Sequence, residues 1–239
     1  MKTTITAFLV LITLSAFAQP WKKIEGNGKI KKESREVGSY TAVSSAGSWD
    51  VMIAYGTSKA IEIEGDDNLV PYIETEVVAG TLKIKSKKYY NLSSRRKIVV
   101  YVNVTELTGV SLAGSGDMIG NGNFTNDGKT TFSLAGSGNI NIGFKNIEKA
   151  NVSIAGSGNV NLKGSADEVT VSIAGSGNAN CEDVVANDVE VSIAGSGSAK
   201  VNANKSLKSS IAGSGDVYYK GTATNIKKSV LGSGKVRQL

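Results

Sequence analysis

The sequence predicts an all-β protein, a right-handed parallel β-helix (solenoid) with coils of about 20 residues that turn at Gly-Ser-Gly corners. Three observations predict it. An Ala-Gly-Ser-Gly string recurs at nearly constant spacing, and the residues on both sides of it alternate between apolar and polar with the period of a strand. The chain also contains 28 glycines but only 2 prolines, which is typical of many tight turns between regular strands.

The repeat defines the coils. The string begins at Ala113, Ala135, Ala155, Ala174, Ala194 and Ala212, with a variant at Leu231, so the spacings are 22, 20, 19, 20, 18 and 19 residues. A degenerate earlier copy is Ala46-Gly47-Ser48-Trp49. One coil cannot bury its apolar face alone, so the coils are expected to stack. The right hand is expected from the general preference of parallel crossovers.

The alternation separates an inside from an outside. Val152 and Ile154 before a corner, and Val160 and Leu162 after it, share the inward side. The same slots in neighbouring coils hold Phe132, Leu134, Ile140 and Ile142, then Val171, Ile173, Ala179 and Cys181, then Val191, Ile193, Ala199 and Val201. The outward side is expected to carry a column of Ser133, Ser153, Ser172 and Ser192 and a column of Asn141, Asn161, Asn180 and Asn202.

Two residues have a role that follows from their slots. Cys181 is the only cysteine and takes an inward slot, so we expect a small buried hydrophobe rather than a reactive thiol. Tyr219 also falls in an inward slot by register.

The N-terminal part is less regular but rich in strand patterns. Residues 40–43, 49–54, 60–64, 73–78, 81–85 and 97–104 alternate or are β-branched, and residues 66–70 predict a turn or one helical turn that Pro71 ends. No linker separates this part from the repeats. We expect one domain over residues 19–239, in which 20–105 form opening coils and a cap and 106–239 form the regular repeats. The chain stops soon after the last corner, so an open β-edge and self-association are expected at that end.

The first 18 residues predict a secretory signal. Lys2 supplies the positive charge, residues 5–14 are apolar but too few to span a bilayer, and Ala16-Phe17-Ala18 is a small-x-small cleavage site. No later segment is apolar enough for a transmembrane helix. The protein is therefore expected to be exported, to the periplasm, or secreted to the cell surface.

The chain is basic, with a formal net charge of +6. Much of this charge gathers at Lys83, Lys85, Lys87, Lys88, Arg95, Arg96 and Lys97. Such a run in an exported protein can meet an anionic polysaccharide or lipid headgroups. It can equally be a solvated strand edge, where lysines discourage edge pairing, and this second interpretation is the more common one.

Particular segments resemble a known bacterial family. They are the repeated Ala-Gly-Ser-Gly-Asn turns, the run Asp67-Asn68-Leu69-Val70-Pro71-Tyr72-Ile73-Glu74-Thr75-Glu76, and Gly80-Thr81-Leu82-Lys83-Ile84. Together they resemble the auto-transporter adhesin head domain, or GIN domain, over about residues 25 to 237. The resemblance implies a right-handed β-helix similar in shape to pectin lyases, without their catalytic residues, and a role in cell adhesion. It transfers no functional residues to positions in this chain.

The corners do not match known ligand motifs. Each Gly-Ser-Gly runs from strand to strand, whereas a phosphate-binding loop opens a helix. Calcium-binding β-rolls repeat every nine residues with an Asp in each turn, whereas here the spacing is about 20 and Asn139, Asn159 and Asn178 follow the corners. We therefore expect no cofactor, no bound metal and no nucleic-acid partner.

An enzyme is the less favoured class. The chain has no histidine, the commonest general base. A polysaccharide-active β-helix enzyme needs clustered carboxylates, but the candidates do not fall into one cleft: Asp167, Glu168, Glu182, Asp183, Asp188 and Glu190.

The hypothesis is therefore an exported, non-catalytic scaffold, an adhesin that contacts a cell-surface glycan or protein with one rigid face. The candidate binding residues are tyrosines expected to be exposed, which can stack on sugars, and outward amides: Tyr89, Tyr90, Tyr218, Asn159 and Asn161. A polysaccharide-active enzyme and a periplasmic partner in envelope signalling are the alternatives.

Overall fold

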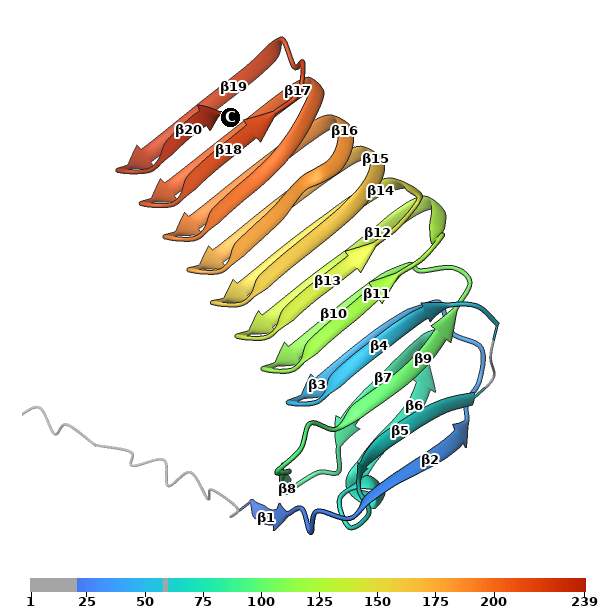
Figure 1. The fold of residues 1–239 in the computed structure, drawn as a ribbon. Helices are drawn as coiled ribbons and strands as arrows, with labels where there is room; N and C mark the ends of the chain where they lie inside the picture. Colours follow the sequence, from blue (N-terminus) through green and yellow to red (C-terminus); the bar gives the residue numbers. More distant parts are fainter. Residues whose placement is uncertain (1–20, 58–59) are drawn as a thin grey trace, which may run out of the picture.

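The computed structural model describes residues 21–57 and 60–239, and the signal sequence expected at 1–18 lies outside them. The described chain is a parallel β-solenoid, as the repeat predicts (Figure 1). Among these residues no helix is long and apolar enough to cross a membrane.

Each regular coil has one strand before a corner and one after it. The strands before the first corners are β3 (Ala42–Gly47), β10 (Gly109–Gly114), β12 (Thr125–Gly136) and β14 (Asn146–Gly156). The strands after them are β4 (Asp50–Tyr55), β11 (Asp117–Asn121) and β13 (Asn139–Gly143). Three long strands then run from corner to corner, namely β15 (Asn159–Gly175), β16 (Asn178–Gly195) and β17 (Ser198–Gly213), and the last coils hold β18 (Asp216–Lys220), β19 (Asn225–Gly232) and β20 (Lys235–Gln238). All of these pair in parallel, one coil apart.

The core consists of the inward slots. Val152, Ile154 and Leu162 are each at most 2% exposed, and Cys181 is 1% exposed. Tyr219 is also buried, as its register predicts. The apolar inside and polar outside are thus those that the alternation indicates.

The corners need glycine for two different reasons. Gly156 adopts a φ of +130°, which disfavours any side chain. At Gly158 the reason is contact, because an added Cβ would lie 2.1 Å from the carbonyl oxygen of Gly138 in the coil below. The Gly158 N–H also donates to the Gly136 carbonyl oxygen at 3.1 Å, so each corner rests directly on the preceding one.

The outward serines align as expected, since Ser133 pairs with Ser153, Ser153 with Ser172, and Ser172 with Ser192. The expected asparagine column is wrong at its last member. Asn180 pairs with Lys200, whereas Asn202 pairs with Lys220. The reason is local. Ala199 and Val201 take the inward positions, so Lys200 between them points outward and continues the column after Asn180.

The N-terminal part combines coil and antiparallel strands. It contains β1 (Lys22–Glu25), β2 (Ile30–Glu36), β5 (Ala60–Asp66), β6 (Ile73–Val78), β7 (Thr81–Ser86), β8 (Tyr90–Ser93) and β9 (Val99–Val104). β7 pairs in parallel with β3 and β9 with β4, whereas the pairs β2–β5, β5–β9 and β6–β7 are antiparallel. β3 and β4 therefore lie between strands that follow them in the chain, and β10 continues the stack on their other side (Figure 1).

The expected turn before β6 is a 3-10 helix over Val70–Tyr72. Pro71 lies inside it, so the expectation that Pro71 ends the turn is wrong. A proline is tolerated in the first turn of a helix because its missing N–H would have no partner there.

Different side chains cover the two ends of the stack. Trp49 takes the place of a corner glycine, and its indole lies against Gly47, where an added Cβ would meet Cη2 at 2.4 Å.

At the other end Lys228 pairs with buried Ser209 and so takes an inward slot. The Lys228 Nζ lies 5.2 Å from the ring centroid of Tyr219 and donates to the Val236 carbonyl oxygen at 3.3 Å. Its aliphatic stem therefore covers the last core residues.

Candidate functional site

The outward side chains after the corners form two aligned columns, which we call the amide face. The first column contains Asp117, Asn139, Asn159, Asn178, Ser198 and Asp216, and the second contains Ile119, Asn141, Asn161, Asn180, Lys200 and Tyr218. They point outward because they alternate with buried residues such as Ile140 and Val160.

The asparagines form hydrogen-bonded ladders. The Asn159 Nδ2 donates to the Asn139 Oδ1 at 2.9 Å, and the Asn178 Nδ2 donates to the Asn159 Oδ1 at 2.9 Å. In the second column Asn161 donates to the Asn141 Oδ1 at 2.5 Å, and Asn180 donates to Asn161 at 2.6 Å. Each amide has two donors and two acceptor lone pairs, so a ladder amide keeps one of each for a ligand. The hydrogen bonds of the ladder also fix the direction in which each amide group points.

A charged cluster closes the first column toward the N-terminal end. The Asn139 amide donates to the Asp117 carboxylate at 2.8 Å. The Lys97 Nζ lies 2.8 Å from the Asp50 Oδ2 and 3.3 Å from the Asp117 Oδ2. Hydrogen bonds to these two carboxylates raise the pKa of Lys97 above its ordinary value, so this cation is already paired.

An apolar row continues the second column. Tyr101 pairs with Met52, and Met52 pairs with Ile119, which precedes Asn141 in the column. Tyr101, Met52 and Ile119 are 37%, 36% and 37% exposed, although all three are large and apolar. A shallow hollow of about 270 Å³ lies where the row meets the amides and Lys163. An apolar strip beside ordered amides suits a ligand with both apolar and hydroxyl-bearing surfaces, such as a sugar.

Sequence reasoning missed this row. Tyr101 alternates with buried Val100 and Val102, which is a usable signal for an outward aromatic side chain. Met118 and Ile119 are adjacent apolar residues, so the pattern alone does not show which of them points outward. The structure buries Met118 and exposes Ile119.

The five candidate residues do not form one site. Asn159 and Asn161 lie on the amide face, and Tyr218 shares the column of Asn161 three coils further on. Tyr89 and Tyr90 lie at the N-terminal end, where Tyr90 is the first residue of β8 and Tyr89 precedes it. Tyr89 is 43% exposed and Tyr90 and Tyr218 are half-buried, so all three rings are more exposed than that of buried Tyr219.

Local contacts explain how the three tyrosines lie. The Lys88 Nζ lies 4.8 Å from the ring centroid of Tyr89, which has a φ of 70°. The Tyr90 ring packs against Tyr72 with centroids 4.7 Å apart, and this contact half-buries it. The Tyr218 hydroxyl donates to the Asp216 Oδ2 at 3.1 Å. These are different surroundings, and no single ligand group would meet all three rings.

The carboxylates that an enzyme would need have partners on neighbouring coils. Glu190 lies 2.6 Å from the Lys208 Nζ, and Asp183 lies within 4 Å of Lys163 and Lys220. The remaining pairs are Glu168 with Lys149, Glu182 with Lys200, Asp188 with Ser206, and Asp167 with Asn187. Within residues 21–57 and 60–239, no three His, Cys, Asp or Glu side chains are grouped as metal ligands would be.

Cys181 offers no nucleophile to this surface. Burial raises the pKa of its thiol to about 12, so the thiolate is not populated near neutral pH. This matches the small hydrophobe that its slot predicts.

Residues 39–223 match the family described as putative auto-transporter adhesin, head GIN domain. The chain belongs to this family. The resemblance carried by the repeated turns is thereby confirmed, and the GIN-domain match spans both the amide face and most of the antiparallel N-terminal strands.

Solved structures support the same relationship. A putative adhesin from Bacteroides fragilis is 26% identical, covers 90% of this GIN-domain chain and 100% of its own, and superposes with a TM-score of 0.85. A putative lipid binding protein from Parabacteroides distasonis is 29% identical, with 91% and 100% coverage and a TM-score of 0.72. A putative adhesin from Parabacteroides merdae is 25% identical, with 91% and 99% coverage and a TM-score of 0.69. No curated protein sequence matches the chain.

Proposed function

We propose that this GIN-domain chain is an exported, non-catalytic adhesin that binds a cell-surface glycan along the amide face. The observation that carries the proposal is the pair of hydrogen-bonded asparagine ladders beside the exposed row of Tyr101, Met52 and Ile119. Sugars present hydroxyls at their edges and C–H groups on their faces, and this surface offers partners for both.

The regular spacing suits an extended chain. Successive coils are ~4.8 Å apart, so equivalent amides repeat along the solenoid at about the length of one sugar unit. Because the ladder already orders the amides, little entropy is lost when a ligand binds. Individual contacts are weak, and self-association of the protein would strengthen them by multivalency.

The test compares wild-type chain lacking residues 1–18 with two double variants on a glycan array and on cells. Asn141→Ala/Asn161→Ala deletes amides, and Ser153→Ala/Ser172→Ala deletes the same number of polar groups from the outward serine column. We expect the amide variant to bind its glycans about tenfold more weakly and the serine variant to bind like wild type. Blank wild-type arrays, or equal loss in both variants, would contradict the proposal. Release of unsaturated or reducing ends would favour the enzyme instead.

Its location has a separate test. The adhesin hypothesis requires the protein to reach the cell surface. Fractionation followed by proteolysis of intact cells should therefore degrade it, whereas full protection would place it in the periplasm and exclude contact with other cells.

A further inference from the structure

A second candidate site lies at the N-terminal end, where the Lys97–Asp117 pair closes the first column of the amide face. A hollow of about 190 Å³ is lined by the cationic residues Arg95, Arg96 and Lys97 together with Ser48, Trp49 and Ser94. The structure divides the basic run of the sequence. Lys85 pairs with Glu76 at 2.7 Å and Lys97 pairs with Asp50, but neither the Arg95 nor the Arg96 guanidinium has a hydrogen bond or ion pair in the part of the chain that the structure describes.

Trp49 forms part of the wall of this hollow. It is 3% exposed, and its Nε1 is buried without an acceptor among the described residues. A buried donor without a partner is costly and uncommon in folded proteins. The exposed Arg95 and Arg96 guanidiniums line the same hollow and have no protein acceptor among the described residues, so they are free to pair with an anionic ligand.

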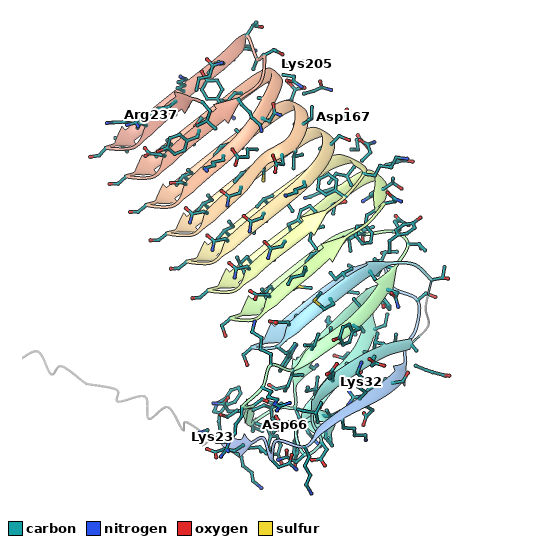
Figure 2. All side chains as sticks on the ribbon, viewed as in Figure 1. Lys23, Lys32, Asp66, Asp167, Lys205 and Arg237 are labelled. Carbon is teal, nitrogen blue, oxygen red and sulfur yellow. The ribbon has the colours of Figure 1, made fainter. Side chains whose placement is uncertain are left out.

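Buried Asp66 anchors the backbone turn that carries the arginines. It is fully buried, and it accepts hydrogen bonds from the Gly28 N–H at 2.6 Å and from the Ser94 hydroxyl. The Ser94 oxygen in turn accepts the Arg96 N–H at 3.2 Å. Figure 2 shows Asp66 among the packed side chains of this end, between Lys23 and Lys32. The turn that presents the arginines is therefore anchored to the core, which lowers the entropy lost on binding.

A neighbouring hollow extends the site. It measures about 240 Å³ and shares Ser48, Trp49 and Leu92 with the first. Trp21, Tyr90 and Asn91 are among its other lining residues, and Trp21 is 64% exposed. Aromatic rings and an amide thus adjoin a cationic hollow, and Leu92 of β8 lines both hollows.

We propose that these two hollows bind an acidic sugar unit of a glycan. Its carboxylate or sulfate lies against Arg95 and Arg96, and its ring packs beside Tyr90 and Trp21. Planar guanidinium groups bind such oxyanions with paired hydrogen bonds, and aromatic rings pack on sugar faces. This inference deepens the proposed adhesin function by naming a ligand class, but it uses different residues, so it stands or falls independently of the amide face.

The experiment measures binding of a chondroitin sulfate tetrasaccharide by calorimetry, with the neutral tetrasaccharide of N-acetylglucosamine as the comparison. We expect Arg95→Gln/Arg96→Gln to weaken binding about tenfold or more. The matched control is Lys205→Gln/Lys227→Gln, which removes the same charge from exposed lysines at the C-terminal end, where Figure 2 shows Lys205. This control should bind within about twofold of wild type, and wild-type affinity should fall as salt rises.

Several results would overturn the inference. Equal binding of the acidic and neutral tetrasaccharides would remove the role of the anion. Equal binding of sodium sulfate and the acidic tetrasaccharide would leave a simple anion site without a sugar. Tighter, arginine-dependent binding to vesicles containing phosphatidylglycerol would assign the site to lipid headgroups. An arginine variant that binds like wild type would exclude the site. Loss of binding in Asn141→Ala/Asn161→Ala, with the arginine variant intact, would support only the amide face.

Discussion

Replacing one corner glycine with alanine tests the stacking geometry directly. In Gly158→Ala the new Cβ would lie 2.1 Å from the Gly138 carbonyl oxygen and 2.7 Å from the Leu134 Cδ2. Gly158 has no left-handed φ, so the substitution isolates close contact from backbone strain. The oxygen that it meets accepts the Asn159 N–H at 3.2 Å and cannot move without disturbing that bond.

The expected loss of stability follows from these contacts. Relief of the clash requires the two corners to separate, which weakens the hydrogen bonds from Gly158 to Gly136 and from Asn159 to Gly138. A buried polar group left without a partner costs about 1–3 kcal/mol. Overpacking adds about 1–3 kcal/mol. We therefore expect the free energy of unfolding to fall by about 2–6 kcal/mol.

The assay is urea unfolding followed by circular dichroism and by tryptophan fluorescence. Two probes are needed because a repeat protein can unfold in segments. The matched control is Ser157→Ala, which changes the exposed residue between the corner glycines and should alter stability by at most about 0.5 kcal/mol. If Gly158→Ala unfolds at the same urea concentration as this control, the corners do not stack as described.

Two further predictions concern the last coil and the core. Lys228→Val replaces an inward cation with the residue type found at Val191 and Val171, two and three coils earlier in the same column. The C-terminal self-association expected from the sequence should therefore strengthen about tenfold or more, as measured by sedimentation. Unchanged association would show that Lys228 does not oppose it. The raised pKa of Cys181 adds stability that is fully present below pH 9 and is lost as the pH rises toward 12, because only the unfolded thiol ionises in that window. Relative to Cys181→Ala, wild-type stability should therefore fall there by up to about 1.4 kcal/mol per pH unit in denaturant titrations, and parallel curves would contradict the burial of the thiol.

Much of the regular region could be predicted because its geometry is local. The inward positions of Val152, Cys181 and Tyr219 follow from the alternation around the corners. The same alternation recurs in each coil, so each coil supports the assignment again. The prediction for Asn202 is wrong because the inward positions, and not the residue type, decide which side chain continues the column. Lys200, flanked by Ala199 and Val201, occupies that place.

The candidate site was less accessible to prediction. Asn159 and Asn161 could be assigned to an outward face because alternation decides the side of a strand. The degree of exposure of a ring depends on distant neighbours, which is why Tyr90, packed on Tyr72, is only partly exposed. The apolar row from Tyr101 to Ile119 joins strands whose pairing no local pattern reveals.

The sequence by itself determined the coil length, the corners and which side chains face inward, because stacking neighbours lie one repeat apart and alternation has a period of two. Only the tertiary structure decided that β7 and β9 lie against β3 and β4, that Asp66 is buried beneath Ser94, and that Trp49 lies beside the arginines. These contacts join segments of unlike sequence across long loops. Burial and partners distant in the chain make these contacts stabilising. The periodic pattern of the sequence carries no information about either.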